Sequence, residues 1–276
     1  MRAFATRAVT RRCVSLAVSL ACATFVASGC ANENDPAGTP FVPVHPGVLT
    51  VATAFLPAPG FWQGNPPTSG FEAKLALVLA QRLGLERVRV VQVPFASIVS
   101  GHLDGADIAI SQLTPTGERE KHLDFTTPYL TAPSGVLARV GVEASDLQTL
   151  QGLRWVVSTT STLTAVVQDV IRPSGPPVVT EDRTAALKVL RESRADVLML
   201  DLPVAMGLAR LEPGSYRVLG QVAVNHGLAA ALPDHSPNLE IVDSAIRGLQ
   251  ADGTIDQLQS RWLGDPGNVP LIRTQP

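Results

Sequence analysis

The chain has 276 residues, of which 45% are hydrophobic and 17% charged, so it can bury a large core and is not an intrinsically disordered chain. Its formal net charge of −2 argues against a nucleic-acid-binding protein, which normally carries a basic excess. Beyond the N-terminal region the apolar residues form no repeated segments of about 20 residues, which argues against a multi-pass membrane protein.

The N-terminal 29 residues are predicted to be an export signal. Residues 1–12 hold four arginines and no acid, residues 13–26 are apolar but too short for a comfortable membrane span, and small residues follow up to Cys30. This ending resembles the lipobox of bacterial lipoproteins, in which the cysteine is acylated, with palmitate for example, and becomes the new N-terminus. The alternative is a soluble secreted protein cleaved nearby, and the pair Arg11-Arg12 also permits twin-arginine export.

The cysteines agree with an exported protein, because all three, Cys13, Cys22 and Cys30, lie in or at the end of the signal. The body beyond Cys30 can therefore form no disulfide. Removing residues 1–29 takes away four arginines, which shifts the formal net charge from −2 to −6. Residues 30–46 are rich in Pro, Asn and Asp and are predicted to be a flexible tether.

Strands and helices alternate along the body. The first predicted block comprises strands at 48–52, 88–93 and 106–111 and helices at 71–83 and 95–103. The second comprises strands at 155–158, 177–180 and 197–200 and helices at 162–172 and 183–193. Two helices, at 239–249 and 254–263, follow. Ser69 and Glu72 have the spacing of a capping box at the first helix. Strand–helix–strand units with short links predict two α/β blocks with parallel strands, more consistent with two lobes than with one continuous sheet.

The motifs of common catalytic and cofactor sites are missing from the sequence. It has no GxSxG, GxxxxGK[ST] or GxGxxG, and its five histidines lack metal-binding spacing. No cofactor or metal is expected, and an enzyme is disfavoured, although a Ser/His/Asp set need not be local in sequence.

Two segments carry candidate binding residues. After the strand at 106–111, hydroxyl groups of Thr114 and Thr116 lie within six residues of Arg119, a combination suited to a carboxylate. The alternative is a surface turn with a solvated arginine. Asp201 follows the apolar strand at 197–200, where ligand sites of α/β proteins lie, and the alternative is a helix cap.

The first segment resembles a motif of the family-3 solute-binding proteins, the receptors of amino-acid ABC importers. Thr114, Thr116 and Arg119 match the family's T-x-T-x-x-R, and residues 123–129 (LDFTTPY) match its V-D-F-S-x-P-Y. Further similar segments are residues 70–72 (GFE), 100–107 (SGHLDGAD), 150–154 (LQGLR), 252–254 (DGT) and 261–264 (RWLG). The resemblance runs from about Val48 to Gly264.

The resemblance implies an α/β, two-lobe type-2 periplasmic-binding-protein fold, in which each lobe is a sheet flanked by helices. Lobe one would comprise residues 47–138 and 225–265, and lobe two residues 139–224. Two hinge strands, near 136–139 and 222–226, would join them. Residues 266–276 would form a C-terminal tail.

The resemblance also implies a site between the lobes. Arg119, with Thr114, Thr116 and Gln112, would bind the α-carboxylate of an amino acid, and Asp201 its α-ammonium. Ser161 and Thr162 match hydroxyls at a helix N-terminus, although Thr160 replaces a glycine of the family pattern. Phe55 or Phe61, and Phe95, lie near ligand-sandwiching positions, with core packing as the alternative.

A neutral or acidic ligand is favoured over a basic one, because Ala54 stands where receptors for basic amino acids carry an acid. Glu72 is a weak exception.

The function implied is a monomeric, non-enzymatic receptor that delivers an amino acid to a membrane permease. It would be lipid-anchored through Cys30 at the outer face of the cell membrane, or periplasmic, without nucleic-acid partners. One alternative is a periplasmic dehydratase of the cyclohexadienyl or arogenate type on the same fold. Another is the sensing module of a receptor, although no membrane span or kinase region follows residue 264. A cell-wall transglycosylase would need a catalytic domain that this length excludes.

Overall fold

The computed structural model describes residues 40–64 and 67–273, so the predicted signal, Cys30 and most of the predicted tether lie outside the described residues. The first predicted α/β block is confirmed. Its elements are β1 (Val48–Thr53), α1 (Phe71–Arg82), β2 (Arg87–Gln92), α2 (Phe95–Val99), β3 (Ile108–Leu113), a 3₁₀ turn (Arg119–Lys121), β4 (Leu123–Phe125) and β5 (Leu130–Arg139).

The second block and the C-terminal helices are also confirmed. The elements from residue 147 onward are α3 (Leu147–Gln151), β6 (Trp155–Ser158), α4 (Leu163–Val166) with a π turn (Val167–Ile171), β7 (Val178–Thr180), α5 (Arg183–Arg191), β8 (Val197–Asp201), α6 (Leu202–Leu211), β9 (Tyr216–Pro233), α7 (Leu239–Ala251), α8 (Thr254–Trp262) and β10 (Leu271–Ile272). Of these, α3, α6 and β10 were not predicted.

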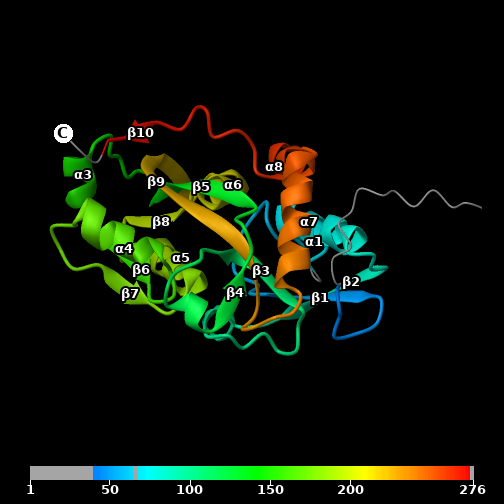
Figure 1. Ribbon diagram of the computed structural model, residues 1–276. Helices are drawn as coiled ribbons and strands as arrows, with labels where there is room; N and C mark the ends of the chain where they lie inside the picture. The colour runs from blue at the N-terminus through cyan, green and yellow to red at the C-terminus, as the bar shows by residue number, and fades with distance from the viewer. Residues whose placement is uncertain (1–39, 65–66, 274–276) are drawn as a thin grey trace, which may run out of the picture. The chain divides into compact units, whose positions relative to one another are not determined.

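The long strand β9 belongs to both parts of the sheet, whose strand order is β2-β1-β3-β9-β5-β8-β6-β7 (Figure 1). On one side β1 pairs in parallel with β2 and β3, while β3 and β4 pair antiparallel with β9. On the other side β6 pairs in parallel with β7 and β8, and β5 pairs antiparallel with β8 and β9. We call the part with β1–β4 lobe one and the part with β6–β8 lobe two; β5 and β9 contain the expected hinge segments.

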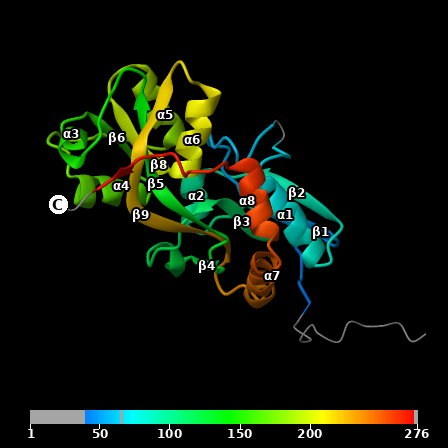
Figure 2. The same cartoon turned by 90° about the horizontal axis from the view of Figure 1, so that it is seen from above.

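The helices of lobe one cover both faces of its sheet. Helices α1, α7 and α8 pack together (Figure 2), and α2 contacts β1 and β3. Side chains alternate between the faces, because successive residues of a strand point to opposite sides. Leu49 and Val51 of β1 join the core cluster that contains the α1 side chains, whereas Ala52 joins the cluster that contains Ile98 of α2.

Lobe two has the same layered construction. Val156 and Leu198 join the core cluster that contains the buried side chains of α5 and α6, whereas Trp155, Val157 and Met199 join the one under α3 and α4. Burial on both faces explains why β6 and β8 read as continuous apolar runs in the sequence. Asp182 caps α5 as predicted, accepting a hydrogen bond from the Ala185 N–H at 2.8 Å.

The predicted capping box at α1 is wrong. The N-cap is Gly70, not Ser69, and no side chain caps the helix. Gly70 has a φ of +105°, and a Cβ there would lie 2.3 Å from the carbonyl oxygen of Phe61, so only glycine fits. Glu72 instead points into the protein and is fully buried.

Segments at both ends of the body pack against it, unlike the expected tether and tail. Phe41 is buried, and the Val42 backbone exchanges two hydrogen bonds of 2.9 Å with the Asn238 side chain. Within residues 266–276, β10 pairs in parallel with β9, and Ile272 is buried in the core of lobe two. Backbone pairing to distant segments explains both differences from the expected chain organisation.

Candidate functional site

A cavity lies where the two lobes meet at the carboxyl ends of their strands. Lobe one contributes Leu56, Phe95, Gln112, Thr114 and Arg119; the polar lining from lobe two is Ser158, Thr160, Ser161, Thr162, Thr164, Arg183 and Asp201. Its volume is about 50 Å³. Since each buried water needs roughly 10–15 Å³ on such a measure, this space holds a few waters.

Arg119 lies at the start of the 3₁₀ turn and reaches into the cavity. Its Nη1 donates to the Thr114 carbonyl at 2.7 Å, and its Nη2 donates across to the Thr160 carbonyl of lobe two at 2.9 Å. The guanidinium also stacks over the ring of Phe95, 5.6 Å from the centroid. Burial lowers the pKa of Arg119 to about 10, which keeps it charged at neutral pH. It therefore presents a desolvated cation whose acceptors are neutral carbonyls.

The predicted neighbours of Arg119 divide into two groups. Thr114 and Gln112 line the cavity. Thr116 is not among the lining residues; its hydroxyl accepts the backbone N–H of Arg119 at 3.3 Å and so helps to hold the turn. Gln112 has a φ of +48°, unusual for a residue other than glycine. This backbone conformation accompanies a 2.8 Å hydrogen bond from its N–H to Glu72 Oε1.

Asp201 ends β8 on the opposite wall of the cavity. It occupies the N-cap position of α6, but its side chain makes no capping hydrogen bond, so the helix-cap alternative is wrong. The residue is 7% exposed and forms no ion pair with any described residue. Burial raises the pKa of Asp201 to about 6, although the charge of Arg183 acts in the opposite direction. At neutral pH this carboxylate is thus ionised and available to an incoming cation.

The hydroxyl residues of lobe two also face the cavity. Ser161 and Thr162 line it directly before α4, and the Ser161 hydroxyl accepts the Leu163 N–H at 3.2 Å. Thr160 contributes a carbonyl that accepts from Arg119.

The aromatic candidates separate clearly. Phe95 lines the cavity beneath Arg119, whereas Phe55 is 40% exposed and does not line it. Phe61 is buried in the core, edge-to-face with Phe71 at 5.9 Å.

Arg183 is a cavity residue that the sequence did not reveal. It is the first residue of α5, and its Nη1 donates to the Pro57 carbonyl and to Gln112 Oε1, both at 3.2 Å. Both acceptors belong to lobe one, so Arg183 and Arg119 each hydrogen-bond from one lobe to the other. In this part of the sequence only the adjacent Asp182 was recognisable, as the N-cap of a helix.

Glu72 lies behind the cavity wall and is not among the lining residues. Its oxygens accept hydrogen bonds from the Gln112 backbone and side-chain amides and from the Tyr129 hydroxyl. Burial raises the pKa of Glu72 to about 7, while the hydrogen bonds from Tyr129 and Gln112 act to lower it. A sequence signal existed, because Glu72 lies on the same helical stripe as Leu75 and Leu79.

Residues 40–64 and 67–273 contain no group of three or more His, Cys, Asp or Glu side chains placed to hold a metal ion. None of their helices combines the length and hydrophobicity needed to cross a membrane.

Comparisons with known proteins agree with this architecture. Residues 49–265 match the sequence profile of the bacterial extracellular solute-binding proteins, family 3. The L-cystine-binding protein TcyJ of Escherichia coli (strain K12) is 25% identical over 255 residues, covering 91% of this chain and 92% of TcyJ. A solved ancestral arginine-binding protein bound to arginine superimposes with a TM-score of 0.67 at 27% identity, covering 79% of this chain and 99% of that chain.

An enzyme is also among the similar proteins. Membrane-bound lytic murein transglycosylase F of Ectopseudomonas mendocina is 28% identical over 274 residues, covering 95% of this chain but 54% of the transglycosylase. The chain thus spans about half of that protein.

Proposed function

Because the chain belongs to family 3 of the bacterial extracellular solute-binding proteins, we propose that it is the substrate-binding component of an ABC importer for an amino acid. One observation carries the proposal: Arg119 from lobe one and Asp201 from lobe two line the same cavity, and neither has an ion-pair partner among the described residues. A free amino acid carries the two complementary charges, a carboxylate and an ammonium, on groups bonded to the same carbon atom.

The roles of these residues follow from their chemistry. The guanidinium of Arg119 binds the ligand α-carboxylate, which replaces the Thr160 carbonyl as acceptor for Nη2. The hydroxyls of Thr114, Ser161 and Thr162 supply further donors. Asp201 accepts hydrogen bonds from the α-ammonium.

The cavity volume of about 50 Å³ corresponds to only a few waters, so we propose that an opening step admits the ligand. The ligand enters with the lobes apart, and closure adds the contacts of Asp201 and the lobe-two hydroxyls to those of Arg119. Only contacts that exist in the closed form favour closure. Ligand binding therefore shifts the protein to a closed form that a permease can distinguish from the open form.

A neutral or acidic amino acid is the proposed ligand class. Ala54 is buried and does not line the cavity, and Glu72 directs its oxygens to Gln112 and Tyr129. Within residues 40–64 and 67–273, no carboxylate besides Asp201 therefore lines the cavity to pair with a cationic side chain. The similar proteins are named for different ligands, cystine and arginine, so their names do not decide the ligand of this chain.

The proposed setting is the outer face of the cell membrane, with Cys30 lipidated and a membrane permease as partner. The mature protein acts as a monomer. The lipidation and membrane location rest on the sequence pattern at residues 1–30, outside the described residues, and the permease partner on membership of the family.

The experiment is a thermal-shift screen of the purified full chain with the twenty amino acids and cystine, followed by calorimetry on those that stabilise it. Binding to the native state raises the melting temperature, by an amount corresponding to roughly 2.7 kcal/mol at 100 times Kd. Absence of a shift with every amino acid contradicts the proposal. Product formation from prephenate or arogenate would instead support a dehydratase.

A further inference from the structure

In the described part of the chain, two arginines and a single acidic residue line the cavity. Arg119 and Arg183 come from opposite lobes, and Asp201 is the acid. Among the residues that the structure describes, neither arginine forms an ion pair. The charged groups lining the cavity therefore sum to one excess positive charge, in surroundings where an uncompensated charge is costly.

Arg183 is held in a way that leaves one edge of its guanidinium open. The start of α5 is fixed by the Asp182 cap, and Nη1 bridges the Pro57 carbonyl and Gln112 Oε1. Within the described part of the chain, Nη2 and Nε donate no hydrogen bond. Two parallel donors of this kind match the two oxygens of a carboxylate.

The carboxylates near Arg183 either accept hydrogen bonds from other groups or are assigned to the ligand in the proposed function. Burial lowers the pKa of Arg183, and the charges of Asp201, Glu72 and Asp182 act in the opposite direction. Glu72 accepts hydrogen bonds from Gln112 and Tyr129, and Asp182 caps α5. In the proposed function Asp201 is taken by the ligand ammonium. Once the ligand is bound, Arg183 then lacks a free counter-charge unless the ligand supplies one.

We propose that Arg183 is the specificity-determining residue of the cavity and binds a second carboxylate, located in the side chain of the ligand. The preferred ligands are dicarboxylic amino acids such as glutamate or aspartate. This inference rests on the proposed amino-acid binding. A cationic side chain would instead add a third positive charge to the cavity.

The test compares nearly isosteric ligands that differ in one charge. Calorimetry on the full chain measures Kd for L-glutamate and L-glutamine, and for L-aspartate and L-asparagine. We expect one acid to bind at least tenfold more tightly than its amide. Arg183→Gln should reduce this ratio at least tenfold, chiefly by weakening the acid, while Arg183→Lys, which keeps the charge but loses the fork, should fall between the two.

Arg191→Gln is the matched control, because Arg191 lies on the same helix but pairs with Glu212 at the surface, with an N–O distance of 3.0 Å. It should leave every Kd unchanged within twofold, and melting temperatures confirm that each variant is folded. If the wild type binds an amino acid but shows no acid preference, or if Arg183→Gln leaves the ratio unchanged, the inference is wrong and the proposed function stands. If the wild type binds no amino acid, the proposed function is wrong and the inference falls with it.

Discussion

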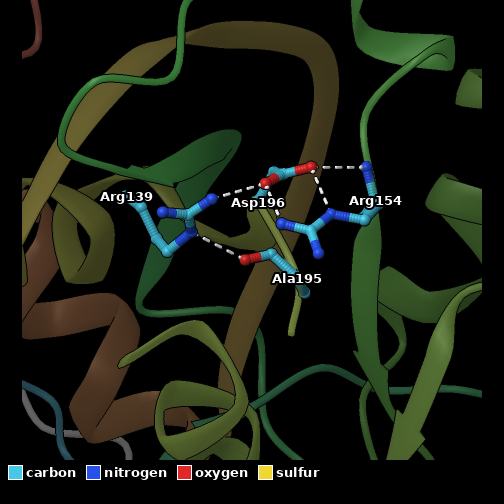
Figure 3. A network of polar contacts seen from close by, with 4 residues as sticks. All are labelled: Arg139, Arg154, Ala195 and Asp196. Carbon is cyan, nitrogen blue, oxygen red and sulfur yellow. Dashed lines mark hydrogen bonds and ion pairs between the residues drawn. The ribbon is translucent and has the colours of Figure 1, made fainter. Parts of the chain in front are cut away.

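The two ends of strand β8 carry acids with opposite surroundings. Directly before the strand, Asp196 accepts from Arg139 Nη2 and Arg154 Nη2, both at 2.7 Å, and also from the Arg154 backbone N–H at 3.0 Å (Figure 3). The hydrogen bonds from Arg154 in particular hold the pKa of Asp196 well below its usual range. At the other end, Asp201 is buried without an ion pair, and burial raises its pKa to about 6.

This contrast separates a structural acid from a candidate binding acid on one short strand. Asp196 has two cationic partners, so its contribution goes to the stability of lobe two. Asp201 lines the cavity without an ion pair among the described residues, so a ligand ammonium can supply a direct partner. Strongly shifted pKa values occur at both kinds of position, and the direction of the shift together with the presence of partners distinguishes them.

The largest expected effect concerns the arginines, which show the same contrast. Arg119→Ala should weaken amino-acid binding roughly 100- to 1,000-fold, about 3–4 kcal/mol, because it removes the proposed carboxylate partner in a desolvated site. Arg154→Ala, which removes an arginine already paired with Asp196, should change Kd less than twofold. Calorimetry on both variants provides the comparison, and wild-type affinity of Arg119→Ala would reject the site.

The next largest effect is expected when Asp201 and Asp196 are each replaced by asparagine. Asp201→Asn should weaken binding roughly 10- to 100-fold, since a neutral amide binds the ligand ammonium less strongly than a carboxylate. Asp196→Asn should leave Kd unchanged and lower the free energy of unfolding by about 1–3 kcal/mol, because charged hydrogen bonds are lost. Calorimetry measures Kd and urea denaturation measures the free energy of unfolding for both variants. Equal losses of affinity would contradict the contrast.

The pH dependence of binding follows from the raised pKa of Asp201. In the proposed function the ionised form binds the ligand ammonium, so affinity for a neutral amino acid should fall as the pH drops through about 6. With one coupled proton, Kd should rise about tenfold between pH 7 and pH 5. Asp201→Asn should show no such change. A flat wild-type profile would mean that Asp201 does not titrate in contact with the ligand.

The smallest effect concerns Glu72, whose pKa is raised on folding from its ordinary 4.5 to about 7. The folded protein therefore retains a proton that the unfolded chain has lost, and this contribution to stability is present below pH 4.5 and is lost as the pH rises through about 7. Between pH 6 and pH 7.5, the free energy of unfolding of the wild type should fall relative to that of Glu72→Gln by about 1 kcal/mol. Urea denaturation at both pH values gives the difference. A constant difference would show that Glu72 does not change protonation in this range.

The sequence predicted the parallel strands of the two blocks, most helices and the placement of Arg119 and Asp201, because strand ends and short motifs are local features. It did not predict β4 or β10, whose partners on β9 are distant in the chain. Arg183 was missed because its relevance depends on a side chain reaching across to the other lobe. Glu72 was misassigned because a capping-box pattern competed with the buried stripe of α1. Phe55 was misplaced because an aromatic after a strand can face either way.

The sequence around residues 41–45 also did not predict that this segment packs against the folded body. Their polar, proline-rich composition is typical of a tether, yet partners far away in the chain satisfy their backbone groups. The Asn238 side chain bonds Val42, and the Asp107 carboxylate accepts the Val44 N–H at 2.6 Å.

The shared strand β9 determines when lobe one becomes complete. Leu113 of β3 pairs with Ala229 of β9, and all of lobe two lies between them in the chain. Until β9, α7 and α8 have been added, the β3 edge has no neighbour and the apolar face of α1 lacks its covering helices. As the polypeptide emerges from the ribosome or from an export channel, lobe one is therefore begun first and finished last, and its assembly waits for a long-range closure that slows folding.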